Sequence, residues 1–197
     1  MKRLFDLFFS LAGFLVLSPI FIILSLLIIV TMGWPIFYRQ IRVGRGGAQF
    51  KIIKFRSMVK NAEKRGLAVT TAGDPRVTAV GRFLRRTKLD ELPQLLNVIS
   101  GDMSLVGPRP EVPKYVALYD DHQRNVLSVR PGLTDPASIV YRHEEEILAR
   151  YADTEKAYIE VLMPAKLRLN LAYIKKQSFC RDLALIGRTL RKIFSSC

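Results

Sequence analysis

Two adjacent acidic residues, Asp90 and Glu91, stand in the most basic part of this 197-residue chain, directly after Arg85, Arg86 and Lys88. A carboxylate can bind Mg²⁺ together with phosphate oxygens, and arginine binds phosphate through paired hydrogen bonds. A carboxylate can also attack phosphorus and form an acyl phosphate. These residue types therefore predict chemistry on a phosphorylated substrate, although two acids at a helix N-terminus are also a common structural feature.

The positive charge of the chain is concentrated in one segment. The whole sequence has a net charge of +14, and residues 39–88 hold 14 Lys and Arg against Glu63 and Asp74, a net charge of +12. So basic a segment is typical of proteins that bind nucleic acid, anionic lipid or phosphorylated substrates. We recognise no nucleic-acid-binding module, so no nucleic-acid partner is expected. A basic membrane adaptor without catalytic activity stays as the alternative.

The N-terminal segment is apolar enough for a membrane. Residues 7–38 contain no charged side chain, and about 20 apolar residues suffice to cross a bilayer. A signal peptide would have a shorter apolar core. Ser18 and Pro19 interrupt the segment, and basic residues flank both of its ends, which favours the cytoplasm for both. We therefore expect a re-entrant helix–break–helix over residues 1–38, with a single transmembrane span as the alternative.

The remaining residues, 39–197, are predicted to form a cytosolic catalytic domain at the membrane surface, of α+β class and mainly helical. Residues 36–56 are predicted to form a β-hairpin, since 36–43 are strand-like and 49–55 are rich in β-branched and aromatic residues. The glycines at 44–47 are interpreted as its turn because they lack the spacing of a phosphate loop. The other expected elements are a loop at 60–77, two helices within 77–100, an irregular segment at 104–113, a helical stretch at 142–176 broken at Pro164, and an amphipathic helix at 182–194.

Two short patterns position the candidate residues. Thr87, followed three residues later by Asp90, is typical of a helix N-cap and predicts that Asp90 and Glu91 lie at the positive end of a helix. The stretch 107–110, Gly-Pro-Arg-Pro, places Arg109 on a rigid loop. We expect Glu144, Glu145 and Glu146 to form a solvated face or to pair with the basic C-terminal tail.

Two longer blocks carry a resemblance to a known family. The residues at 89–98 read LDELPQLLNV and those at 101–110 read GDMSLVGPRP. Together they resemble the bacterial sugar transferase family, in its small form, the monotopic phosphoglycosyl transferases. Four shorter stretches also resemble this family: Lys2-Arg3-x-x-Asp6, the Ser18-Pro19 pair, Lys54–Met58 and Arg130–Thr134. The resemblance therefore covers about residues 2–134.

The resemblance implies a membrane enzyme on the cytoplasmic face of the bacterial inner membrane. It would move a sugar 1-phosphate from a UDP-sugar to undecaprenyl phosphate and release UMP, in the assembly of surface glycoconjugates. Asp90 matches the nucleophile that forms a phosphosugar intermediate, Glu91 acts as general base or metal-site partner, and Mg²⁺ binds at Asp90 with Glu91 contributing. Phosphate and substrate binding is expected at Lys54, Arg56, Arg85, Arg86, Arg109 and Arg130. The amphipathic faces could serve lipid or a second subunit in a homodimer.

The chain departs from the commoner family pattern after Thr134. Many relatives continue with a glycine and an aromatic residue, whereas this chain has Asp135-Pro136-Ala137-Ser138, and the stretch 141–151 with its three glutamates is also different. The sugar that the chain uses is therefore not predicted.

Overall fold

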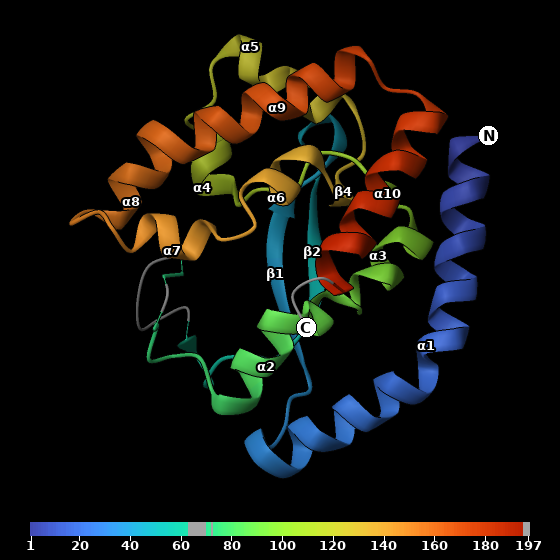
Figure 1. Cartoon of the computed structure of the whole chain (residues 1–197), viewed down its shortest axis with the longest axis vertical. Helices are drawn as coiled ribbons and strands as arrows, with labels where there is room; N and C mark the ends of the chain where they lie inside the picture. Colours follow the sequence, from blue (N-terminus) through green and yellow to red (C-terminus); the bar gives the residue numbers. More distant parts are fainter. Residues whose placement is uncertain (63–69, 72, 195–197) are drawn as a thin grey trace.

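The computed structural model describes residues 1–62, 70, 71 and 73–194, and it confirms a mainly helical α+β chain. Helices surround a central β-hairpin, and the long N-terminal helix α1 follows one side and the lower edge of the molecule (Figure 1). The strands are β1 Phe37–Val43, β2 Gln49–Phe55, β3 Ser104–Val106 and β4 Gly132–Thr134. The α-helices are α1 Lys2–Met32, α2 Ala79–Thr87, α3 Gln94–Ser100, α4 Pro113–Val116, α5 Asp121–Arg124, α6 Pro136–Val140, α7 Glu144–Leu148, α8 Thr154–Ala157, α9 Met163–Lys175 and α10 Phe179–Phe194. Short helical turns are η1 Arg45–Gly47, η3 Leu89–Glu91, η4 Asn125–Ser128 and η5 Tyr158–Leu162.

The predicted hairpin is confirmed. Strands β1 and β2 pair antiparallel from Phe37 opposite Phe55 to Val43 opposite Gln49. The glycine-rich turn closes with a hydrogen bond of 2.7 Å from the Gly44 amide to the carbonyl of Ala48, directly before β2. On β2, Phe55 is buried and its ring lies 5.4 Å from that of Phe21 on α1. The end of the hairpin therefore packs against the middle of α1, while α3 is the main neighbour of that helix.

Helix α1 runs unbroken through Ser18 and Pro19, so the predicted break is wrong, but the helix bends about its middle (Figure 1). A proline inside a helix leaves the carbonyl four residues earlier without its backbone donor. Here that carbonyl belongs to Leu15, and the Ser18 hydroxyl donates to it at 2.7 Å. Because the freed acceptor finds a local donor, the chain bends and stays helical.

Both ends of α1 are fixed to the rest of the chain. Near its start, Arg3 donates to the Val98 carbonyl at 2.6 Å, and the buried Asp6 accepts from Ser104 Oγ at 2.8 Å. At its end, Arg56 Nη2 donates to the Met32 carbonyl at 2.5 Å. A straight helix of 31 residues would be about 46 Å long, so the bend is what lets one small domain hold both ends.

The outer side of α1 is apolar and exposed. It is the one helix of the described residues that is long and apolar enough to cross a membrane. The large apolar side chains that it exposes by more than 60% are Leu4, Phe8, Leu15, Val16, Ile22, Ile23 and Val30. So large an exposed apolar surface is typical of a membrane contact, and it indicates a membrane location for the chain.

The segment 104–113, predicted to be irregular, begins with a strand. β3 pairs in parallel with β4, Ser104 opposite Gly132 and Val106 opposite Thr134. Next to this pair, a Cβ on Gly107 would lie 2.4 Å from the Arg130 carbonyl oxygen, so only glycine allows the two backbone segments to approach this closely. The prolines limited the strand to three residues but did not exclude it.

The C-terminal third differs from prediction in where its helices stop. The expected break at Pro164 is wrong, since Pro164 lies in the first turn of α9, where a missing amide costs nothing, and the π-turn η5 leads directly into it. The interruption lies between α7 and α8 instead. Helix α10 begins at Phe179, slightly before the predicted start. Residues 63–69 and 72 of the expected loop, and 195–197, lie outside the described residues.

Candidate active site

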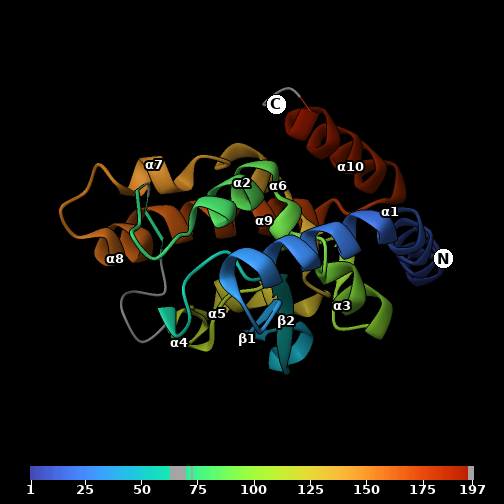
Figure 2. The same ribbon diagram turned by 90° about the horizontal axis from the view of Figure 1, so that it is seen from below.

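A cavity of about 1640 Å³ collects most of the residues that the sequence singles out. Its lining comes from α1, the hairpin, the described residues between β2 and α2, α2, η3, the loop after β3, and the segment from α6 to α10. Seen from below, α2, α6, α7 and α9 lie on the same side of β1 and β2 (Figure 2). The predicted residues in the lining are Lys54, Arg56, Arg85, Arg86, Asp90, Glu91 and Arg109. Residues far apart in the sequence therefore line the same cavity.

The acidic pair lies on the short turn η3 between α2 and α3, so the predicted helix N-cap is wrong. Thr87 Oγ1 donates back to the Phe83 carbonyl at 2.8 Å and caps nothing downstream. Lys88 adopts a left-handed conformation, with φ 59°, that ends α2, and α3 begins only at Gln94 after Pro93. The carboxyl groups of Asp90 and Glu91 thus extend from a short turn and lie in different surroundings.

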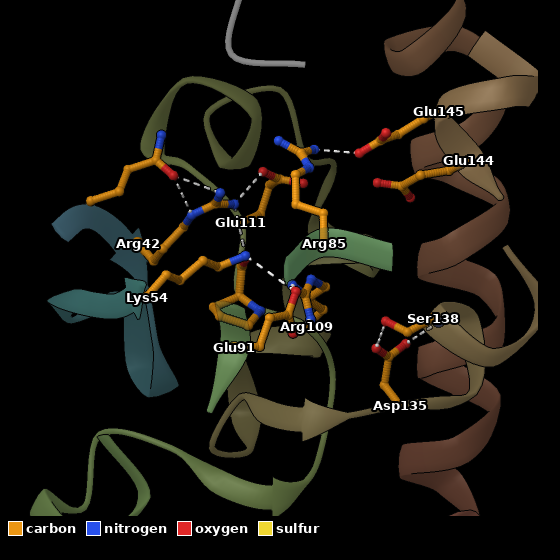
Figure 3. A network of polar contacts seen from close by, with 12 residues as sticks. Arg42, Lys54, Arg85, Glu91, Arg109, Glu111, Asp135, Ser138, Glu144 and Glu145 are labelled. Carbon is orange, nitrogen blue, oxygen red and sulfur yellow. Dashed lines mark hydrogen bonds and ion pairs between the residues drawn. The ribbon is translucent and has the colours of Figure 1, made fainter. Parts of the chain in front are cut away.

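Glu91 is held by two cations from different elements. Arg109, on the loop after β3, donates from Nη1 to Oε2 at 3.1 Å and from Nη2 to Oε1, while Lys54 on β2 reaches Oε1 at 3.2 Å (Figure 3). Burial raises the pKa of the Glu91 carboxyl, but the charges of Arg109 and Lys54 outweigh it and hold that pKa well below its usual value. Glu91 is therefore a fixed anion.

Asp90 has the opposite surroundings. Its side chain is buried, with 6% of the residue exposed, and Oδ1 has no hydrogen-bond partner among the described residues. Burial raises the pKa of the Asp90 carboxyl, and the neighbouring charge of Glu91 raises it further. A buried, unpartnered carboxylate is costly for the fold and is free to react, which suits a nucleophile.

The far side of the cavity carries two more carboxylates, on α7. Glu145 accepts from Arg85 of α2, and Glu144 accepts at 2.7 Å from Lys166 of α9. Both side chains point from α7 toward the arginines (Figure 3). The expectation of a solvated face or a pair with the C-terminal tail is thus wrong for these two. Their place outside the commoner family pattern was the signal that could have found them.

Two of the predicted phosphate-binding residues have other contacts. Arg56 is buried and donates to the last carbonyls of α1, although it also borders the cavity. Arg130 donates to the Gly101 carbonyl at 2.9 Å and is not among the described residues that line the cavity. Their binding of phosphate stays a prediction.

Asp135 explains the first departure from the family pattern. Its buried carboxylate accepts from the amides of Ala137 and Ser138 at 2.8 and 3.1 Å and so caps α6, while Pro136 occupies the first helical position. Aspartate before proline is a strong helix-start signal. This residue therefore positions the wall of the cavity through α6.

The donor set fits Mg²⁺ only together with a substrate. Among the described residues no three His, Cys, Asp or Glu side chains gather as a metal site. Mg²⁺ commonly binds one or two carboxylates and completes its shell with phosphate oxygens and water. Asp90 Oδ1 is available for this role, whereas both oxygens of Glu91 already accept from Arg109.

Comparisons with known proteins identify relatives of this chain. A family model described as bacterial sugar transferase matches residues 1–196. The UDP-N-acetylgalactosamine-undecaprenyl-phosphate N-acetylgalactosaminephosphotransferase of Aeromonas hydrophila is 35% identical over 98% of this chain, which spans 44% of that relative. The UDP-glucose:undecaprenyl-phosphate glucose-1-phosphate transferase of Escherichia coli is 33% identical over 98% of the chain and 40% of the relative. The exopolysaccharide production protein ExoY of Sinorhizobium fredii is 37% identical over 96% of the chain and 83% of its own length.

Proposed function

Because the chain belongs to the bacterial sugar transferase family, we propose that it transfers a sugar 1-phosphate from a UDP-sugar to undecaprenyl phosphate, with release of UMP. The names of two relatives supply the donor and acceptor classes, and that of a third indicates exopolysaccharide assembly. The observation that carries the proposal is Asp90, a buried carboxylate without a partner beside a Glu91 that two cations hold in place. A membrane adaptor would have no use for such a costly carboxylate.

In the first step Asp90 attacks the phosphorus that carries the sugar. A bond forms between a carboxylate oxygen and this phosphorus, and the bond from the same phosphorus to the oxygen that bridges the two phosphates breaks. UMP leaves with that oxygen, and the sugar phosphate stays on Asp90 as an acyl phosphate. Arg85 and Arg109, which line the same cavity, are placed to neutralise charge on the phosphates.

In the second step an oxygen of undecaprenyl phosphate attacks the same phosphorus. The acyl–phosphate bond breaks, the carboxylate of Asp90 is regenerated, and the product is an undecaprenyl diphosphate sugar. Glu91 is ionised and fixed by Arg109 and Lys54, so its role in this proposal is to orient these cations toward the diphosphate. A general-base role for Glu91 stays a prediction.

Mg²⁺ is the proposed cofactor, with Asp90 as its protein ligand. When bound, the ion supplies charge neutralisation on the donor diphosphate. Asp90 fits because its Oδ1 is free, and Glu91 would join only by giving up a hydrogen bond from Arg109. Chelation by EDTA is therefore expected to stop turnover and added Mg²⁺ to restore it.

The proposed activity is tested by UMP release in detergent. Purified protein, Mg²⁺ and undecaprenyl phosphate are combined with a panel of UDP-sugars, and UMP is measured. With one of these donors we expect sustained release that requires the acceptor, and with donor alone a single equivalent of UMP and a gain of one sugar phosphate in the protein mass. No UMP release from any donor would contradict the function.

We place α1 as a re-entrant helix that enters the membrane from the cytoplasmic face of the bacterial inner membrane and returns to it. The support is that the contacts of Arg3 and Asp6 at one end, and of Met32 at the other, join the same domain, while the side of α1 between them exposes apolar residues. The division into a membrane segment at 1–38 and a domain at 39–197, and the homodimer, stay predictions.

The topology is tested by cysteine labelling in intact cells. Met1 is fully exposed ahead of α1, so in a variant with Cys180 and Cys197 replaced, a cysteine in a short extension before Met1 is expected to react only with a membrane-permeant maleimide. Replacing Ser18 and Pro19 by alanine in the same variant should straighten α1 and make this cysteine reactive from the periplasm. Periplasmic labelling of the parent variant would show a full span instead.

A further inference from the structure

The wall of the cavity formed by α7 suggests how the chain selects its donor. Resting on the proposed function, we propose that Glu144 determines specificity by accepting hydrogen bonds from hydroxyl groups of the donor's sugar. α7 lies on the side of the cavity away from β1 and β2, and the Glu144 carboxylate points into the space next to Arg85 (Figure 3).

One oxygen of Glu144 is held by an ion pair, while 37% of its side chain is exposed. Lys166 of α9 donates to its Oε2 at 2.7 Å, and the same ammonium lies 5.5 Å from the centre of the Tyr158 ring. The Lys166 side chain is only 13% exposed, so it cannot easily follow a moving partner. Oε1 of Glu144 has no hydrogen-bond partner in the part of the chain that the structure describes. A fixed carboxylate with one free oxygen is a pre-organised acceptor.

Charge decides which part of the donor this acceptor meets. A carboxylate repels a diphosphate but accepts readily from hydroxyl groups. The diphosphate therefore belongs near the cations Arg85 and Arg109, and a neutral part of the donor belongs near Glu144. Glu145 is less suited to this role because it is already engaged by Arg85.

The comparisons favour the sugar over the nucleoside as that neutral part. The two relatives named for their donors share UDP and differ in the sugar, N-acetylgalactosamine in one and glucose in the other. A side chain that selects among such donors has to contact the sugar, and Glu144 lines the same cavity as the cations that would hold the diphosphate.

The proposal is tested with Glu144→Gln, which keeps the size of the side chain but removes its charge. For the best UDP-sugar, kcat/KM for UMP release should fall about tenfold or more, because the lost acceptor was charged. For the epimer of that sugar the loss should be smaller, so that the preference between the two donors narrows. Inhibition by UDP, which has no sugar, should stay the same or strengthen because repulsion of the diphosphate is relieved.

Glu160→Gln is the matched control, since Glu160 is an exposed acid on η5 outside the residues that line the cavity, and it should leave the donor preference unchanged. If Glu144→Gln weakens UDP and UDP-sugar equally, or leaves the epimer preference within about twofold of wild type, the proposal is overturned. If Glu144→Gln does not fold, the same ratio measured on Glu144→Asp decides. A wild-type protein that releases no UMP from any donor would overturn the proposed function instead.

Discussion

Asp90→Asn should lower UMP release by about four orders of magnitude or more, because a nucleophile that forms the covalent intermediate has no substitute. The amide is close in size to the carboxylate but is a very poor nucleophile toward phosphorus. Without the first step neither the burst of UMP nor the gain of sugar phosphate in protein mass should appear. The rate with a radiolabelled donor and the intact mass of the protein measure the two effects.

The same variant should fold at least as well as the wild type. Burial raises the pKa of Asp90 above that of the unfolded chain, so ionising this carboxyl costs the folded state more free energy than it costs the unfolded chain. This stability cost grows as pH rises through the folded pKa, and asparagine removes it. We therefore expect an equal or higher Tm at pH 7 for Asp90→Asn.

Asp102→Asn is the control, because Asp102 is an exposed acid that accepts from Ser100 Oγ at 2.7 Å and does not line the cavity. It should keep full activity. Covalent labelling in Asp90→Asn, or near-normal turnover, would show that another group attacks the donor.

What the sequence predicted well is governed by neighbours along the chain. The hairpin follows from strand-forming residues around a glycine turn. At Pro19 the sequence predicted a break, whereas the hydroxyl of Ser18 keeps the chain helical there. The gathering of Lys54, Arg85 and Arg109 around the acidic pair was expected from charge and from the resemblance, and the cavity lining confirms that they lie together.

What the sequence did not show depends on partners distant in the chain. Strands β3 and β4 pair in parallel but have only three residues each, too few to show a periodic pattern in the sequence. The close approach of the two segments becomes evident only from the backbone atoms that surround Gly107. Thr87 fits the N-cap pattern in its local sequence, but Lys88 adopts a left-handed backbone conformation that directs the acidic pair into the cavity. The role of α7 depends on where α2 and α9 pass it.

The difference between the two acids likewise arises from the fold rather than from their residue types. Asp90 and Glu91 are neighbours on one turn, yet within the described part of the chain the cations from β2 and from the loop after β3 donate hydrogen bonds to Glu91 and not to Asp90. One carboxylate is thereby kept charged and fixed, while the other stays free of partners. Replacing one of these cations should therefore change the surroundings of both carboxyl groups.

Arg109→Met is expected to lower kcat/KM about 10²- to 10³-fold, the range seen when one charge-stabilising donor is removed from an active site. Arg109→Lys should recover only part of this, because lysine keeps the charge but not the two parallel hydrogen bonds to Glu91. UMP release at several donor concentrations measures both variants. Arg124→Met, an exposed arginine on α5 outside the cavity lining, serves as control and should match the wild type.

The pH dependence of stability tests whether Arg109 acts by holding the charge of Glu91. In the wild type the pKa of Glu91 is held well below its usual value, although burial alone would raise it. The stability that its charge contributes is therefore present above the pKa of the unfolded chain and is lost only as pH falls through the low folded pKa. In Arg109→Met burial weighs more, so the loss of stability in acid, followed by Tm, should begin at a higher pH than in the wild type. An acid transition at the same pH in both proteins would show that Arg109 does not hold the charge of Glu91, and that its contribution to catalysis acts on the substrate alone.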